Sequence, residues 1–232
     1  MEVWISDASR PAAVSLVRSR IIAVAIAAAL AALYKRVLRK SILNWGATDK
    51  EASARLPGDE LLADADGVST RAIDIDAPPA AVWPWLAQMG PSPRGGAYTY
   101  DWIENLLGLN MHSADRVLSE YQNPQVADTI ELGSNRMRLE VVEPKHALGW
   151  RSEDGNWVWT FVLVDRGGTT RLISRNRFRL ASLKARIGML PMEPGSLVME
   201  RRMLREIKRL SEGLTADGDD RTGRHRTQDA GQ

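Results

Sequence analysis

The sequence contains no cysteine, and this absence removes several classes of site at once. Neither a disulfide framework, a thiolate nucleophile nor a thiolate metal site can form. Histidine is scarce as well, and His112, His146 and His225 lie too far apart in the chain for the spacing of a zinc site. No phosphate-binding loop, dinucleotide fingerprint or Gly-x-Ser-x-Gly nucleophile elbow occurs in the chain. We therefore expect neither a bound metal nor a cofactor.

An excess of positive charge is missing from most of the chain. Residues 1–45 carry seven Lys or Arg against two acids, a net charge of +5. The other 187 residues carry 24 basic and 27 acidic groups, a net charge of −3, although the sequence pI is about 9.0. A globular domain with this balance lacks the basic surface that binds nucleic acid, so we expect no nucleic-acid partner.

Residues 21–34 contain no charge, and they are bracketed by arginines before and by four cations after. The run is apolar on every side of a helix, which argues against a helix lying in the membrane plane. A membrane span needs about 20 apolar residues, but flanking apolar side chains and snorkelling cations can lengthen a shorter run. We therefore predict an apolar helix within residues 1–43 that anchors the chain in a membrane through residues 12–40. A cleaved signal peptide and a buried or partner-bound helix are the alternatives.

The heavier cluster of positive charge follows the apolar run, which favours a cytoplasmic location for the main domain. Residues 44–65 show no sustained period and contain Pro57 and Gly58, so they are predicted to form an extended connector. Regular patterns fill residues 66–212, the predicted domain. Residues 213–232 are predicted to be a disordered tail, because from residue 215 onward they offer no large apolar side chain for burial.

The sequence pattern of the domain predicts mostly strands. Ile73 and Ile75 alternate with polar residues, and a Pro-Pro pair then opens a short helix that ends near Met89. Alternation predicts further strands at 127–132, 137–143, 146–152, 157–165 and 169–180, whose short turns indicate an antiparallel meander. Leu197, Met203, Leu204, Ile207, Leu210 and Leu214 form one stripe, which predicts a long amphipathic C-terminal helix.

Three stretches of this chain resemble a known superfamily. "TRAIDIDAPPAAVWPWLAQMG", "YTYDWIENLLG" and "WTFVLV…TTRLISRNRF" are similar to the entry strand and helix, the next segment and the final strand pair of SRPBCC proteins, in particular of actinobacterial type. The resemblance covers residues 44–212. It implies the α+β helix-grip fold of START and Bet v 1-like proteins, in which an antiparallel sheet wraps around a long C-terminal helix. It also implies a cavity, which different members use for lipids, polyketides or hydrophobic hormones, and some members are cyclases or dehydratases.

Two strand faces supply candidate ligand contacts. Trp157, Trp159 and Phe161 share one face of their strand, which is either a ligand wall or plain core. On the last strand Ser174, Asn176 and Phe178 share a face, and the two polar groups could orient a ligand in an apolar pocket. Met199 and Met203 are the predicted contacts on the C-terminal helix. Arg171, Arg175, Arg177 and Arg179 share the opposite strand face, which is predicted to be solvated and paired with surface acids; binding of anionic head groups is the alternative.

Residues 88–108, "QMGPSPRGGAYTYDWIENLLG", are too polar for a core segment and too aromatic for a linker. We interpret them as a gate at the mouth of the cavity and refer to them as the gate. The predicted ligand contacts in the gate are Arg94, Tyr98, Tyr100 and Trp102. Asp101 fits an N-cap and Glu104 the third helical position of a capping box. Alternatively, one of these two carboxylates is a proton-transfer base whose pKa is raised by burial.

These patterns leave three functions open. The first is a membrane-tethered module that binds or transfers a hydrophobic small molecule or lipid. The second is a cyclase- or dehydratase-like enzyme that uses Asp101 or Glu104 as its base. The third is a protein-interaction module with a closed cavity. The sequence names neither the ligand nor the oligomeric state.

Overall fold

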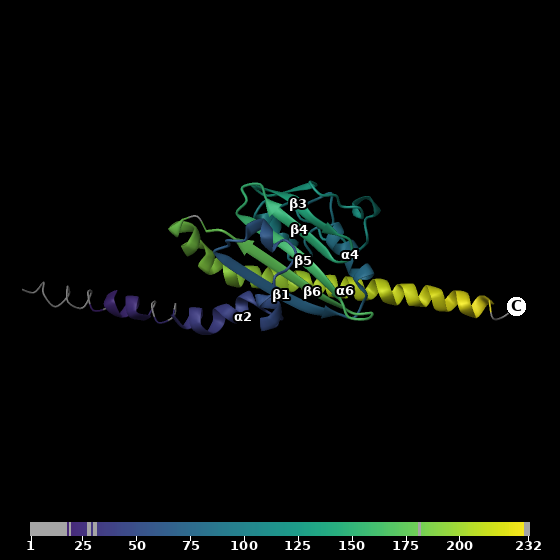
Figure 1. Cartoon of the computed structure of the whole chain (residues 1–232), viewed down its shortest axis with the longest axis horizontal. Coiled ribbons are helices and arrows are strands. Elements are labelled where there is room, and N and C mark those ends of the chain that lie inside the picture. Colours follow the sequence, from purple (N-terminus) through teal and green to yellow (C-terminus); the bar gives the residue numbers. More distant parts are fainter. Residues whose placement is uncertain (1–17, 19, 27–28, 30–31, 181, 230–232) are drawn as a thin grey trace, which may run out of the picture. The chain divides into compact units, whose positions relative to one another are not determined.

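A computed structural model describes residues 18, 20–26, 29, 32–180 and 182–229 (Figure 1). The chain divides into two units, residues 1–41 and 42–232. A π-helical segment η1 (Tyr34–Leu38) leads into α2 (Arg39–Leu43). Among the described residues, no helix combines the length and the apolar character needed to cross a membrane. Residues 12–17, 19, 27–28 and 30–31 of the predicted anchor lie outside the described residues, so membrane attachment stays a prediction.

The second unit is built on one antiparallel sheet with the strand order β1-β6-β5-β4-β3-β2. Its strands are β1 (Gly67–Ile75), β2 (Thr129–Leu132), β3 (Asn135–Glu143), β4 (Ala147–Ser152), β5 (Trp157–Asp165) and β6 (Thr170–Phe178). The chain meanders from β2 to β6, and β6 then pairs with β1 along its whole length. The strands lie where the alternating pattern predicts them, because each alternation marks a strand with one face in the core.

A long helix, α6 (Leu183–Asp229), follows the sheet and runs across it in Figure 1. Met203, Leu204, Ile207 and Leu210 of α6 are buried in the core with residues of the sheet and of α4 (Pro79–Ala87). The predicted apolar stripe therefore does face the core at these four positions. One antiparallel sheet and one long C-terminal helix make an α+β fold, as predicted, with the layout that the SRPBCC resemblance implies.

Helical backbone also continues through most of the segment 213–232 that composition predicts to be disordered. The helix ends at Asp229, and residues 230–232 lie outside the described part of the chain. The sequence prediction considered only the lack of apolar side chains to bury. Extending an existing helix needs no burial, because each added residue gains one backbone hydrogen bond.

Residues 44–65 are not an extended connector, which corrects the prediction for this segment. They contain α3 (Asp49–Ser53) and the short 3-10 helix η2 (Asp59–Leu62). Thr48 and Glu51 form a capping box at the start of α3. Ala47 and Leu56 pack against the outer sheet face, on a small cluster of Ala72, Val162 and Ile173. The segment thus covers the face of the sheet that lies opposite α6.

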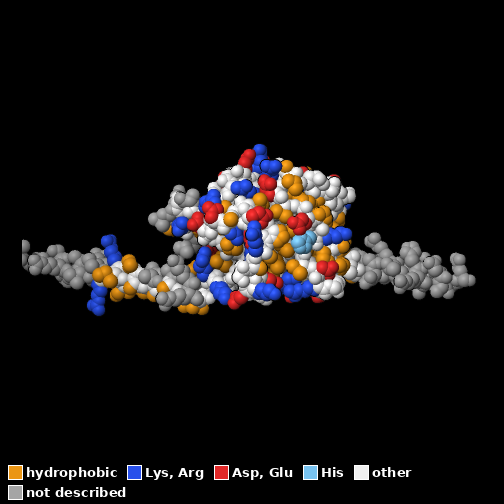
Figure 2. Space-filling view, in the orientation of Figure 1, with side chains coloured by type: hydrophobic (Ala, Val, Ile, Leu, Met, Phe, Trp, Pro, Cys, Tyr) orange, Lys and Arg blue, Asp and Glu red, His pale blue; other side chains and the backbone are white. Residues whose placement is uncertain are grey.

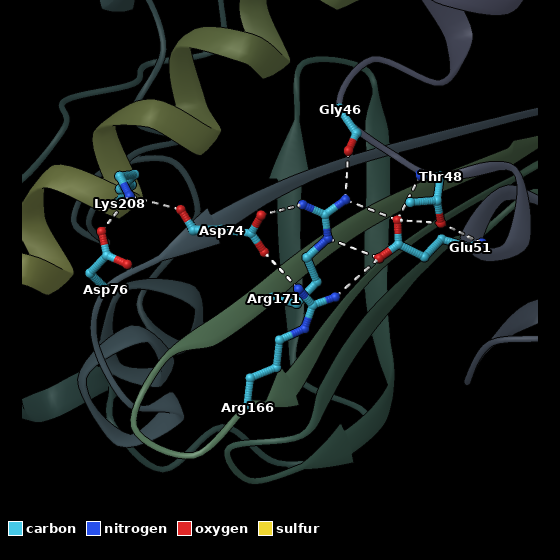
Figure 3. Close-up of polar contacts among 8 residues, drawn as sticks. All are labelled: Gly46, Thr48, Glu51, Asp74, Asp76, Arg166, Arg171 and Lys208. Carbon is cyan, nitrogen blue, oxygen red and sulfur yellow. Dashed lines mark hydrogen bonds and ion pairs between the residues drawn. The ribbon is translucent and has the colours of Figure 1, made fainter.

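Arg171 shows why this face is covered rather than solvated. Its Nε and Nη2 donate to the two carboxylate oxygens of Glu51 at 2.8 and 2.9 Å, and its Nη1 donates to Asp74 at 3.1 Å (Figure 3). Nη2 also donates to the backbone oxygen of Gly46 at 2.5 Å. A two-point Arg–carboxylate contact fixes orientation as well as distance. Arg171 therefore holds the turn before α3, and α3 itself, against the end of β6.

Arg175 lies four residues further along β6, on the same face, and makes a second attachment. It is 2% exposed and donates to Asp59 at 2.7 Å and to the backbone oxygens of Glu51, Ala52 and Ala54 at 2.6, 3.1 and 2.7 Å. These oxygens belong to the C-terminal end of α3, where a cation is favourable. The prediction of a solvated arginine face is therefore wrong for Arg171 and Arg175. The pattern identified their shared face but not the segment that covers it.

The Glu51–Arg171 pair predicts a specific acid sensitivity. Hydrogen bonds from Arg171 lower the pKa of Glu51 from 4.5 to about 2. A carboxyl with a lowered pKa stabilises the fold at pH values above 4.5, and this contribution disappears as the pH falls towards 2. We expect Glu51→Gln to lower the free energy of unfolding at pH 7 by about 1–2 kcal/mol and to flatten the loss of stability in acid. Urea unfolding at a series of pH values measures both effects.

The matched control is Glu153→Gln, because Glu153 is an exposed glutamate on the β4–β5 turn. It should leave both the stability at pH 7 and the acid profile unchanged. An unaltered acid profile for Glu51→Gln would show that this pair does not set the acid sensitivity.

Candidate functional site

A small cavity of about 20 Å³ lies between the gate and the sheet. Met89, Gly90 and Ala97 of the gate and Met111 after it form one side. The sheet supplies the rest of the lining: Ile130, Leu132, Met137, Trp150 and Trp159. This volume is room for about one water molecule. The space is apolar throughout and nearly filled by its own lining, and it is too small for the kind of ligand that the resemblance implies.

Gln88 connects the start of the gate to residues 116–122 through hydrogen bonds. Its side chain is fully buried, and its Nε2 donates to the Tyr98 hydroxyl at 2.9 Å and to the Arg116 backbone oxygen at 3.1 Å. Its Oε1 accepts from the Leu118 backbone N–H at 2.8 Å and from Gln122 at 3.2 Å. Because so many partners converge on one amide, a small number of directed bonds hold this part of the gate in place.

Tyr98, which accepts one of these hydrogen bonds, has a strained backbone. Its φ is +59°, in a region of backbone conformation that residues other than glycine seldom adopt. The residue is 1% exposed, and its ring packs edge-on against Trp85 at 6.1 Å. Burial raises the pKa of the Tyr98 phenol well above its usual value, so the hydroxyl stays neutral. The structure places Tyr98 in the core beside the cavity and not in its lining.

Arg94 lies outside the cavity that it was predicted to serve. Its Nε donates to the Met89 backbone oxygen at 2.8 Å and its Nη2 donates to the Ala87 oxygen at 2.7 Å. The guanidinium sits 4.8 Å from the centre of the Tyr121 ring and lines a separate, open hollow. The sequence therefore finds an important gate residue but assigns it to the wrong side of the gate.

The two carboxylates of the gate also differ from expectation. The short helix α5 (Asp101–Leu106) has Tyr100 as its N-cap, without a side-chain cap. Asp101 is its first residue, and its carboxylate accepts from the backbone N–H and the hydroxyl of Ser113 at 2.8 and 2.6 Å. The N-cap prediction for Asp101 is thus wrong, because this carboxylate is already engaged by the following segment.

Glu104 is 7% exposed, and its Oε2 has no hydrogen-bond partner within the described residues. Burial raises the pKa of Glu104, and the nearby Asp101 charge raises it further. Neither carboxylate is among the residues that line the cavity. Trp102 is not either: it is 69% exposed and, with Leu106 and Leu107, forms an exposed apolar patch on and after α5.

A buried ion pair occupies the inner face of the sheet. Arg71 of β1 and Glu200 of α6 form this pair, and Arg71 also donates to Ser196 at 3.0 Å. Ser174 donates to the Glu200 carboxylate, and Asn176 approaches it at 3.4 Å. Burial raises the pKa of Glu200, and the charge of Arg71 opposes that rise. The two polar residues predicted to orient a ligand are therefore bonded to a carboxylate of the protein itself.

The paired tryptophans of β5 complete this network. Trp159 donates from its indole to Ser174 at 3.0 Å, and Trp157 donates to Asn176 at 2.9 Å. Their rings stack with centroids 6.0 Å apart. Trp159 belongs to the network and to the cavity lining at once. Of the other predicted contacts, Phe161 and Met203 are core residues, and Phe178 and Met199 are half-buried.

Sequence reasoning missed Arg71 and Glu200, although the pattern contains a signal for both. Arg71 is in phase with the half-buried Ile73 and the buried Ile75 of its strand. Glu200 precedes Met203 and Leu204 at helical spacing and so shares the buried stripe of α6. Opposite charges on two inward faces predict a buried pair, because a lone buried charge is too costly. The same logic applies to Thr48 and Glu51, whose spacing is that of a capping box.

The charges on the part of the surface shown in Figure 2 are mixed. On the face that Figure 2 shows, acidic and basic side chains are interspersed, so this face carries no field of one sign. No group of three or more His, Asp or Glu able to hold a metal ion occurs among the described residues.

Comparison with known proteins returns structures alone, because no family model and no curated protein matches the sequence. The polyketide-cyclase-like protein Cgl2372 from Corynebacterium glutamicum is 16% identical, with 65% of this chain and 92% of that chain covered and a TM-score of 0.35. Protein Ms6760 from Mycobacterium smegmatis is 18% identical, with 65% and 92% covered and a TM-score of 0.38. KanY protein is 14% identical, with 63% and 97% covered and a TM-score of 0.41. Likeness at this level adds nothing to the topology described above.

The buried pair leads to a prediction about stability. Glu200→Gln keeps the shape of the side chain but leaves Arg71 charged and uncompensated, so we expect a loss of about 3–5 kcal/mol in unfolding free energy. The double variant Arg71→Met/Glu200→Met should be more stable than Glu200→Gln, because it leaves no buried charge. Chemical denaturation of the wild type, Arg71→Met, Glu200→Met and the double variant gives the coupling energy. Additive losses in this cycle would show that the two charges do not depend on each other.

Proposed function

We propose that this domain binds a small apolar molecule in its interior, and that the gate moves to admit it. The observation that carries the proposal is the lining of the cavity: it is apolar on all sides, and it is shared between the gate and the sheet. Small-molecule sites are lined mostly by apolar side chains, as this cavity is, but they have volumes of roughly 300–1,000 Å³, so this cavity must expand to hold a ligand. Ser174 and Asn176 are bonded to Glu200 and to the β5 tryptophans, so they are not available to orient the ligand.

Three methionines make the lining adaptable. Met89, Met111 and Met137 contribute to the cavity wall. Methionine is unbranched and has three rotatable bonds, so such a wall can be reshaped at a lower cost than one of branched side chains. The present volume of the cavity is about 20 Å³. A ligand larger than one water molecule therefore requires both rearranged methionines and a displaced gate.

Methyl NMR provides the test. In full-length protein with labelled Met methyl groups, naphthalene or decanol should shift the Met89, Met111 and Met137 signals in a saturable way. Met192 serves as an internal reference, because it is 62% exposed and far from the lining in sequence. Native mass spectrometry of the purified protein should also detect a retained apolar compound. If none of the three cavity methionines shows a saturable shift, the proposal is contradicted.

Ala97→Val is the matched blocking variant, because Ala97 lines the cavity and two added methyl groups would fill it. It should keep the fold and lose the saturable shifts. Ala80→Val is its control, since Ala80 is an exposed residue of α4, and it should bind as the wild type does.

The two alternatives differ in their support. The enzyme alternative needs a carboxylate within reach of the ligand, and neither Asp101 nor Glu104 lines the cavity. The interaction alternative has one specific observation in its favour: Trp102, Leu106 and Leu107 are 69, 80 and 69% exposed. Exposed apolar side chains that lie together mark interaction sites more often than single ones do. A cavity that stays closed in the NMR titration, together with stable binding of one protein partner, would favour this alternative.

Membrane attachment through residues 12–40 is the second part of the proposal. Its support is the charge-free run 21–34 and the cations on both sides of it. Alkaline carbonate washing of membranes should leave full-length protein in the pellet. Release of the intact chain into the supernatant would contradict attachment by a span, and a shortened N-terminus would indicate a cleaved signal peptide.

A further inference from the structure

A second hollow, of about 250 Å³, opens between the gate and the segment that leads into β2. Arg94, Glu120, Tyr121, Asn123, Asp128 and Thr129 line it. It shares no lining residue with the apolar cavity, and its character is opposite, because most of these side chains are charged or polar. The hollow therefore selects a different kind of ligand.

Arg94 brings a fixed cation to this hollow. Two of its nitrogens are held by the backbone oxygens of Met89 and Ala87, and the guanidinium lies over the Tyr121 ring. Its third nitrogen, Nη1, has no hydrogen-bond partner within the described residues, and no carboxylate there forms an ion pair with it. Burial lowers the pKa of Arg94, which the more distant Asp128 only partly offsets. A half-buried guanidinium without a paired anion is a favourable site for one.

Asp128 brings a fixed anion to the same hollow. Its backbone is anchored, since the N–H of Ala127 donates to the Leu139 oxygen and the N–H of Leu139 donates to the Asp128 oxygen, both at 2.8 Å. Its Oδ2 accepts from the Gln125 backbone N–H at 2.9 Å. Ala127 has a φ of +79°, which is costly for alanine. Strain of this kind is common where a site holds its residues in place.

We propose that this hollow binds a small zwitterion, with its anionic oxygens at Nη1 of Arg94 and its ammonium group at Asp128 and Glu120. An anion alone would meet two carboxylates, and a cation alone would meet the guanidinium. A ligand that carries both charges satisfies both ends of the hollow, and each charge-assisted hydrogen bond adds selectivity. Free amino acids and zwitterionic phosphate head groups share this chemistry. The hollow and the apolar cavity share no lining residue and are tested with different probes, so either proposal can fail without the other.

Three probes of nearly equal size test the charge requirement: 4-aminobutyrate, butyrate and butylammonium. Backbone amide shifts of Asn123 and Thr129 in the full-length protein report on the hollow. We expect 4-aminobutyrate to bind at least about tenfold more tightly than butyrate or butylammonium, because each of these lacks one charged contact. Equal affinities for 4-aminobutyrate and butyrate, or no saturable shift with any probe, would overturn the proposal.

Asp128→Asn gives the sharpest variant, because asparagine keeps an oxygen for the Gln125 N–H but removes the charge. It should weaken 4-aminobutyrate binding about tenfold and strengthen butyrate binding, which reverses the preference. Arg94→Gln should abolish binding of both 4-aminobutyrate and butyrate. If this variant does not fold, Arg94→Lys takes its place and should keep part of the binding. Asp115→Asn, at an exposed aspartate that does not line the hollow, is the control and should change nothing. Unchanged selectivity in Asp128→Asn would contradict the assignment.

Glycerophosphoethanolamine distinguishes the two sources of this chemistry. Tighter binding of this probe than of 4-aminobutyrate assigns the hollow to phosphate head groups, and the reverse order assigns it to free amino acids. In both cases the methyl signals of Met89, Met111 and Met137 should stay in place, because the probes are too polar for the apolar cavity. Shifts confined to those methyl groups would place the probes in the wrong site and would falsify the assignment.

Discussion

The ion pair between Arg71 and Glu200 constrains the rest of this structure. Two charges between a sheet and a helix cost more free energy than their attraction returns unless further hydrogen bonds complete them. Ser174, Asn176 and Ser196 supply those bonds, and the β5 tryptophans bond to two of these three residues in turn. This network fixes α6 against β1, β6 and β5. It also occupies the inner face at that end of the sheet, whereas the small cavity lies where Met137 and Trp150 face the gate.

The outer face of the sheet is held by the same chemistry with a different partner. Arg171 and Arg175 take the place that apolar side chains have in most covered sheets, and residues 44–65 meet them with carboxylates and with the carbonyl end of α3. Only a small apolar cluster around Ile173 supports this layer. The sheet is thus a middle layer, attached by arginine on both sides, and the folded unit begins at residue 42 and not after a connector.

Alternation and helical spacing were sufficient to predict the order of the strands and of α4 and α6, the approximate bounds of the strands and the inward face of β5 and β6. These features depend on which residues are buried, and burial has a period that a sequence displays. Partners of charged side chains have no such period. The pattern placed Arg171 and Arg175 together on one face, yet it gave no means of bringing Glu51 and Asp59 to them across more than a hundred residues of chain. For the same reason Ser174 and Asn176 were assigned to a ligand when Glu200 already binds them.

In the gate, only a few residues separate the apolar cavity from the polar hollow. Gly90 lines the apolar cavity, and a Cβ at this position would lie 2.8 Å from Cδ of Arg94. Only glycine therefore lets the arginine stem fold back, so that its head reaches the polar hollow while its nitrogens hold the carbonyl oxygens of Ala87 and Met89. Any movement of Met89 and Gly90 that enlarges the cavity must either break these bonds or carry Arg94 with it. An opening of the kind proposed above would therefore displace the guanidinium that lines the hollow, through the backbone at residues 87–90.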